Sequence, residues 1–107
     1  MQTLSALADP IRRQIVEMLA ERERDAGELA SAFPVSRPAV SRHLRVLRQA
    51  GLVQVRPEAQ RRVYALDPRP LEDLAQWLDR YRHFWGQRLD ALDTELARGR
   101  RQGNEER

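Results

Sequence analysis

The arginines of this chain are concentrated in one segment. All nineteen basic residues are arginine, and seven of them lie within residues 36–62 beside a single acid, Glu58, for a net charge of +6. The rest of the chain carries twelve arginines and fifteen acids, a net charge of −3. Arginine suits two-point contacts to phosphate and to guanine. A GC-rich genome would also favour arginine, but a basic segment in an otherwise acidic chain indicates a surface for a polyanion, and we expect nucleic acid.

The residue types that most enzymes and metalloproteins need are nearly missing. The chain has no cysteine and no lysine, which excludes disulfides, thiolate metal ligands and lysine-based covalent catalysis. Its two histidines, His43 and His83, lie forty positions apart, and no nucleophile stands beside a base. We therefore expect no enzymatic activity, no cofactor and no metal site.

Length and hydropathy narrow the class further. The 107 residues suffice for one small domain, and no apolar run approaches the roughly 18 residues that cross a bilayer. The first ten residues lack a basic stretch followed by an apolar one, so we expect no secretory signal. These features predict a cytoplasmic protein with no membrane partner.

Two short helices are expected to position the arginines. Asp25 is the expected cap of a helix over about 26–32, and Ser36 that of a helix over 36–49, which Gly51 closes. If the apolar stripe of the second helix faces inward, its polar residues point outward: Arg37, Ser41, Arg42, Arg45 and Arg48. Two helices joined by about four residues, the second one basic, form a helix-turn-helix pattern.

The flanking segments complete the predicted architecture. A short apolar turn over 4–8, a helix from Asp9 to about Ala20 and a polar connection over 21–24 precede the pair of helices. Two alternating stretches, 52–55 and 61–66, follow it and predict a hairpin whose loop, 56–60, is a wing. The expected fold is mainly α with a small β-hairpin, a winged helix-turn-helix.

The last predicted helix, over 71–97, has a broad apolar face. Its apolar residues recur in steps of three and four, and one small domain cannot cover so wide a face. Part of the face would pack on its own domain, and a membrane-surface helix is disfavoured because acids are mixed with arginines on the polar side. We expect a homodimer. Its contacts would be Leu4, Leu74, Leu78, Tyr81, Trp85, Leu89 and Leu92. Residues 98–107 are expected to form a flexible polar tail beyond the domain of residues 1–97.

Several motifs together resemble the ArsR/SmtB family of bacterial winged-helix repressors. They are LADPIRRQI at 7–15, GELA at 27–30, SRPAVSRHL at 36–44, LRQAGLV at 47–53 and RVYALDP at 62–68. The resemblance implies a homodimer that binds an imperfect palindrome in promoter DNA and usually represses. It places helix 36–49 in the major groove and wing 56–62 beside it. The DNA contacts it implies are Ser36, Arg37, Pro38, Ser41, Arg42, Arg45, Arg61 and Arg62.

The chain departs from the metal-sensing members of that family. Residues 26–32 hold no cysteine, and on the last helix Asp79 is followed two residues later by Tyr81 where the family's second site needs a histidine. The resemblance is therefore to a metal-free subset. Two alternatives stay open: a metal-responsive repressor that uses the last helix, and a protein-interaction module that has lost DNA binding. A small-molecule or protein effector is left open too. For His43 we favour a structural hydrogen bond over a DNA contact, whereas for Arg12 an ion pair and a phosphate contact are equally expected.

Overall fold

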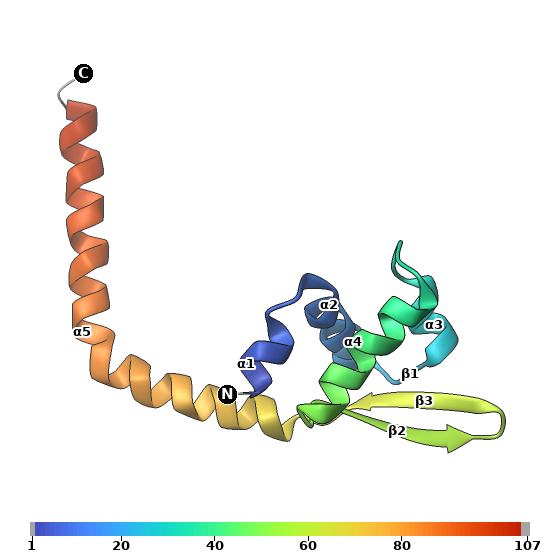
Figure 1. The fold of residues 1–107 in the computed structure, drawn as a ribbon. Helices are drawn as coiled ribbons and strands as arrows, with labels where there is room; N and C mark the ends of the chain where they lie inside the picture. Colours follow the sequence, from blue (N-terminus) through green and yellow to red (C-terminus); the bar gives the residue numbers. More distant parts are fainter. Residues whose placement is uncertain (1, 106–107) are drawn as a thin grey trace. The chain divides into compact units, whose positions relative to one another are not determined.

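The computed structural model describes residues 2–105, and the side chains of residues 2–86, 88 and 90–99. The elements follow in the order α1 (Gln2–Leu7), α2 (Pro10–Glu21), β1 (Arg24–Asp25), α3 (Ala26–Ser31), α4 (Arg37–Gln49), β2 (Val53–Glu58), β3 (Arg61–Leu66) and α5 (Arg69–Glu105) (Figure 1). The chain divides into two compact units between Leu74 and Ala75. The first unit thus holds α1 to β3 and the start of α5, and the second holds the rest of α5.

Side-chain caps begin the helices where the sequence predicts them. The Asp9 carboxylate accepts hydrogen bonds from the backbone N–H groups of Ile11 and Arg12, at 2.8 and 3.2 Å, and so begins α2. Asp25 and Glu28 form a capping box at α3, and the Ser36 hydroxyl accepts from the Ala39 N–H at 3.2 Å. Each cap satisfies backbone donors that would otherwise lack a partner at a helix start.

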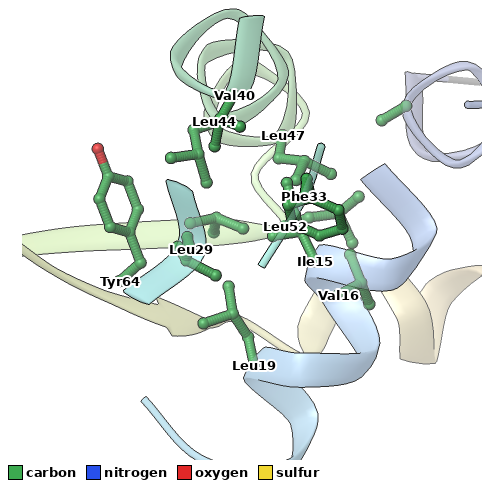
Figure 2. Packing of buried hydrophobic residues seen from close by; sticks show 12 residues of the cluster. Ile15, Val16, Leu19, Leu29, Phe33, Val40, Leu44, Leu47, Leu52 and Tyr64 are labelled. Atoms are coloured by element: carbon green, nitrogen blue, oxygen red, sulfur yellow. The ribbon is translucent and has the colours of Figure 1, made fainter. Parts of the chain in front are cut away.

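One apolar cluster holds the first unit together (Figure 2). From α4, Val40, Leu44 and Leu47 point into this cluster, as the spacing of the stripe predicts. They meet side chains of α2, α3, the sheet and the short segments beside α3 and β2: Ile15, Val16, Leu19, Leu29, Phe33, Leu52, Val53 and Tyr64. Because close-packed interiors resist displacement, this cluster fixes the direction in which the opposite side of α4 faces.

The hairpin is longer and its turn tighter than the sequence predicts. The sheet has the order β1-β3-β2, and β2 pairs with β3 from Val53 opposite Leu66 to Glu58 opposite Arg61. The predicted loop over 56–60 is therefore wrong, since only Ala59 and Gln60 lie outside the strands. Ala59 has a φ of 56°, in the left-handed region, where an L residue with a Cβ is strained.

Three other elements differ from the sequence-based expectation. The predicted apolar turn near the N-terminus is the helix α1. Part of the predicted polar connection is the strand β1, which pairs with β3. The last helix begins at Arg69 and continues to Glu105, beyond the predicted bounds of 71 and 97.

Candidate nucleic-acid interface

The side of α4 opposite the core is basic and exposed. This outer face of α4 comprises Arg37, Pro38, Ser41, Arg42, Arg45 and Arg48, all of them exposed. Five of these residues and the cap, Ser36, which is exposed as well, are the contacts that the sequence predicts on this helix. The sixth, Arg48, was recognised as outward-pointing but was not among the predicted contacts. A rigid helix thus presents four guanidinium groups toward the solvent.

The arginines of the basic segment fall into two groups according to their partners. Among the side chains that the structure describes, no ion pair involves the four arginines on the outer face of α4 or Arg62 of β3. Arg56, by contrast, lies 2.6 Å from the Glu23 carboxylate and 3.2 Å from that of Glu58. Arg61 lies 3.2 Å from the Asp25 carboxylate. The wing arginines are therefore not equivalent, although the sequence predicts both Arg61 and Arg62 as DNA contacts.

The Arg56 contacts also alter the protonation equilibria of the pair. The hydrogen bond from the Arg56 guanidinium lowers the pKa of Glu23, and the same contact raises the pKa of Arg56. Both groups therefore keep their charges at neutral pH and largely cancel each other. The arginines that have no ion pair among the described side chains are not offset in this way.

Strand alternation separates the wing arginines onto opposite faces. Directly opposed residues of an antiparallel pair point to the same side, and Arg62 is opposite Pro57, whereas Arg61 is opposite Glu58. Arg62 shares a hollow of about 290 Å³ with Arg48, Val55 and Pro57. Arg62 thus lies on the α4 side of the hairpin.

Arg12 joins three helices on another side of the unit. Its guanidinium donates hydrogen bonds to the backbone carbonyls of Ala6 and Ser5, at 2.6 and 3.1 Å, and lies 3.4 Å from Nδ1 of His43. That nitrogen is 3.8 Å from the Asp9 carboxylate. Burial raises the pKa of Asp9, but the N–H groups of Arg12 and Ile11 and the nearby positive charges lower it overall. The structure thus gives Arg12 carbonyl partners in place of an ion pair and gives His43, which is half-buried, a neighbour within hydrogen-bond distance.

Asp67 ties the end of the hairpin to the start of α5. Its carboxylate accepts two short hydrogen bonds from the Arg69 guanidinium, at 2.6 and 3.0 Å, and one from the Gln54 amide at 3.0 Å. These contacts, led by that with Arg69, lower the pKa of Asp67 to about 2. The Asp67 N–H donates to the Leu52 carbonyl. The hairpin is therefore held at its base as well as by its strand pairing.

In the second unit, α5 carries an apolar face. Large apolar side chains recur along it in steps of three, four and seven, and seven of them define the apolar face of α5: Trp77, Leu78, Tyr81, Phe84, Trp85, Leu92 and Leu96. Tyr81 is 53% and Phe84 78% exposed. Tyr81 stacks on Trp77, with ring centroids 5.5 Å apart, and meets Trp85 at 5.9 Å.

The predicted dimer contacts lie in different environments. Leu78, Tyr81 and Leu92 are exposed on the apolar face of α5, and Leu4 is exposed on α1. Trp85 is half-buried, and Leu74 is buried within the first unit. The side chain of Leu89 lies outside the residues that the structure describes.

The described part of the chain has neither a cluster of metal ligands nor a membrane-spanning helix. There, no group of three or more His, Asp and Glu side chains is placed to hold a metal ion. None of the helices over residues 2–105 combines the length and the apolar character that a bilayer-crossing segment needs.

Similarity to known proteins assigns this architecture to a family. Residues 9–55 match the model described as "Bacterial regulatory protein, arsR family". The chain is 56% identical over 84 residues to the HTH-type transcriptional regulator Rv2034 of Mycobacterium tuberculosis, across 78% of this chain and 76% of that protein. The chain belongs to the ArsR family.

Two further similarities support this ArsR-family assignment. The transcriptional repressor SdpR of Bacillus subtilis is 34% identical over 73 residues, which cover 68% of this chain and 81% of that protein. The solved structure of an ArsR-like transcriptional regulator from Rhodococcus sp. RHA1 gives a TM-score of 0.75 at 31% identity and covers 87% of this chain and 85% of that one. The protein is thus a DNA-binding transcriptional regulator with a winged-helix fold, and not an enzyme. The predictions of family, fold class and regulatory function are confirmed.

Proposed function

We propose that this ArsR-family protein is a homodimeric repressor that acts in the cytoplasm by occupying a palindromic operator in promoter DNA. The observation that carries the proposal is the outer face of α4. Its four arginines are exposed, have no ion-pair partner among the described side chains, and stand on a helix anchored by a buried stripe. An anchored helix with free guanidinium groups suits the major groove of B-DNA, which admits one α-helix.

Each end of α4 has a role that follows from its chemistry. In helix-turn-helix proteins the N-terminal residues of the second helix contact base edges. Arg37 and Arg42 are therefore the proposed base contacts, with guanine preferred because the guanidinium matches its two acceptors. Ser36, Pro38 and Ser41 would pack against the groove wall and phosphates near the helix start, and Arg45 would bind the backbone.

In the wing, Arg61 and Arg62 are the proposed contacts, and their contributions differ. Arg62 has no ion-pair partner among the described side chains, whereas Arg61 lies 3.2 Å from Asp25. An arginine already paired with a carboxylate contributes less binding free energy when it contacts a phosphate, because the phosphate must replace the carboxylate or share the guanidinium with it. We therefore expect the larger contribution from Arg62.

A second copy of the chain is the proposed occupant of the apolar face of α5. The exposed side chains of Trp77, Tyr81 and Phe84, continued by Leu92 and Leu96, would stay in contact with water in a monomer. Monomers rarely expose so many large apolar side chains along one helix. Two copies related by a two-fold axis would present two α4 helices to DNA, and dimers of helix-turn-helix proteins bind half-sites about one helical turn apart. Leu4, Leu78, Trp85 and Leu89 complete the contacts that we propose for this interface, whereas Leu74, which was expected there, is already buried within the first unit.

Selection of bound duplexes from a random pool tests the proposal. We expect enrichment of a pseudo-palindrome whose half-sites are centred about 10 base pairs apart, and binding that weakens steeply as salt rises. No enrichment, together with no binding at low salt, would contradict DNA binding and favour a protein-interaction module. In cells, a reporter placed behind the selected site should be repressed, and activation would contradict repression.

The dimer has a test of its own, sedimentation velocity on two variants. Tyr81→Arg places a charge on the apolar face of α5 and should yield monomers. His83→Arg adds a charge to an exposed residue two positions away, on the opposite side of the helix, and should leave the wild-type mass unchanged. Equal masses for wild type and Tyr81→Arg would contradict this interface.

A further inference from the structure

We infer that Arg48 of α4 and Arg62 of β3 together bind one phosphate of the DNA backbone, at the wall of the groove that α4 enters. The inference rests on the proposed DNA binding and adds to it a residue, Arg48, and a ligand for Arg62. The two side chains line one hollow of about 290 Å³, whose other walls are Val55 and Pro57 of β2. Both arginines are exposed.

The surroundings of the hollow leave the two positive charges uncompensated. No acidic residue lines it, and neither arginine has an ion pair among the side chains that the structure describes. The acids of the neighbouring strands have other partners: Glu58 of β2 pairs with Arg56, and Asp25 of β1 pairs with Arg61. Two like charges beside one hollow repel each other unless an anion lies between them. The remaining walls are an apolar side chain and a proline, which offers no backbone donor. The hollow therefore suits a small anion held by guanidinium forks, which match phosphate geometry.

The position of Arg48 along α4 decides which part of DNA it meets. At 1.5 Å per residue, Arg48 lies about 16 Å beyond Arg37 along the helix axis, and at 3.6 residues per turn the two share one side of the helix. The major groove is only about 12 Å wide. A helix whose start reaches base edges therefore carries Arg48 back to the sugar-phosphate wall. Arg62 approaches the same place from the hairpin, on the side that faces α4.

The alternative is a structural role, in which Arg48 only stabilises the end of its own helix. It lies in the last turn of α4, where a positive charge interacts favourably with the helix dipole. That role would change the stability of the fold but not the salt dependence of DNA binding. The two roles therefore separate in a titration.

The test measures affinity against salt for Arg48→Ala, Arg62→Ala and the double variant, by fluorescence anisotropy. The probe is a mixed-sequence duplex of about three helical turns, because a backbone contact does not need the operator. The titrations cover about 50 to 200 mM salt. At the lower salt, we expect the affinity of each single variant for DNA to be roughly ten-fold weaker than that of wild type. The double variant should lower the slope of log K against log salt by about one, the value for one phosphate.

Controls and contradicting results follow from the geometry. Arg61→Ala removes the same charge from the neighbouring residue on the opposite face and should change affinity and slope less. Thermal melting should show all variants folded. A loss of about two in the slope for the double variant would mean two separate phosphates, and unchanged slopes with lowered melting would mean a purely structural Arg48. Either result would overturn the shared phosphate contact, and the proposed DNA binding would stand if the wild-type protein still bound the duplex. If the wild-type protein did not bind DNA, both proposals would be overturned.

Discussion

Replacing Leu47 by alanine tests how α4 is held to the core. Leu47 is completely buried, within the apolar cluster of the first unit. The substitution removes three carbon atoms, worth about 0.8 kcal/mol each in transfer from water, or about 2.4 kcal/mol. The cavity left behind adds to this, so we expect a loss of about 3–4 kcal/mol in the free energy of unfolding. That is a large fraction of the roughly 5–15 kcal/mol that stabilises a domain of this size.

Urea denaturation followed by circular dichroism, at one protein concentration, measures this loss. Concentration is fixed because the proposed dimerisation would contribute to apparent stability. Val35→Ala is the matched control: Val35 is 37% exposed just before α4, and we expect a change within about 0.5 kcal/mol. The Leu47 variant should also lose DNA affinity in proportion to its unfolded fraction. A Leu47→Ala loss below about 1 kcal/mol would refute the claim that this stripe anchors α4.

Three further predictions concern the interface, the wing and the base of the hairpin. Arg42→Ala should cost about 1–3 kcal/mol of operator affinity and relax one base preference, and binding selections on the variant would show it; uniform weakening of all sequences would instead make Arg42 a phosphate contact. Ala59→Gly should stabilise the fold by about 0.5–1 kcal/mol in thermal denaturation. Glycine relieves the strain of the left-handed backbone at a φ of 56°, and its greater freedom in the unfolded chain offsets part of this gain. Destabilisation by this substitution would contradict the strain at Ala59. The folded-state pKa of Asp67, about 2, lies below its ordinary value of 3.8. The ionised carboxylate therefore contributes fully to the stability of the fold above about pH 4, and this contribution is lost as pH falls toward 2. Denaturation midpoints of Asp67→Asn should vary less over that range than those of wild type, and equal pH dependence would count against the Arg69 contact.

Local signals in the sequence predicted most of the first unit. Helix starts at Asp9, Asp25 and Ser36 depend on side chains that cap their own helices, within three residues. The inward stripe of α4 depends only on helical periodicity. Such features need no knowledge of distant contacts, so the helix-turn-helix and the exposed face of arginines followed directly.

The features that the sequence did not predict depend on contacts that neither helix caps nor periodicity indicate. The strand β1 has two residues and exists because it pairs with β3, about forty positions later. At α1, Arg12 donates to the carbonyls of Ser5 and Ala6, contacts that periodicity does not indicate. The pairing of Arg56 with Glu23 and of Arg61 with Asp25 likewise spans more than thirty residues. From the sequence, seven arginines form one basic segment. In the structure, two of them are held in ion pairs and five have no ion pair among the described side chains.

A DNA titration of the triple variant Arg37→Ala, Arg42→Ala and Arg45→Ala against wild type tests whether the outer face of α4 binds DNA. All three side chains are exposed, so circular dichroism and melting should match wild type. We expect wild-type binding that weakens steeply between about 50 and 200 mM salt, and little binding by the variant at either salt. A folded triple variant that binds DNA with wild-type affinity and wild-type salt dependence would contradict it.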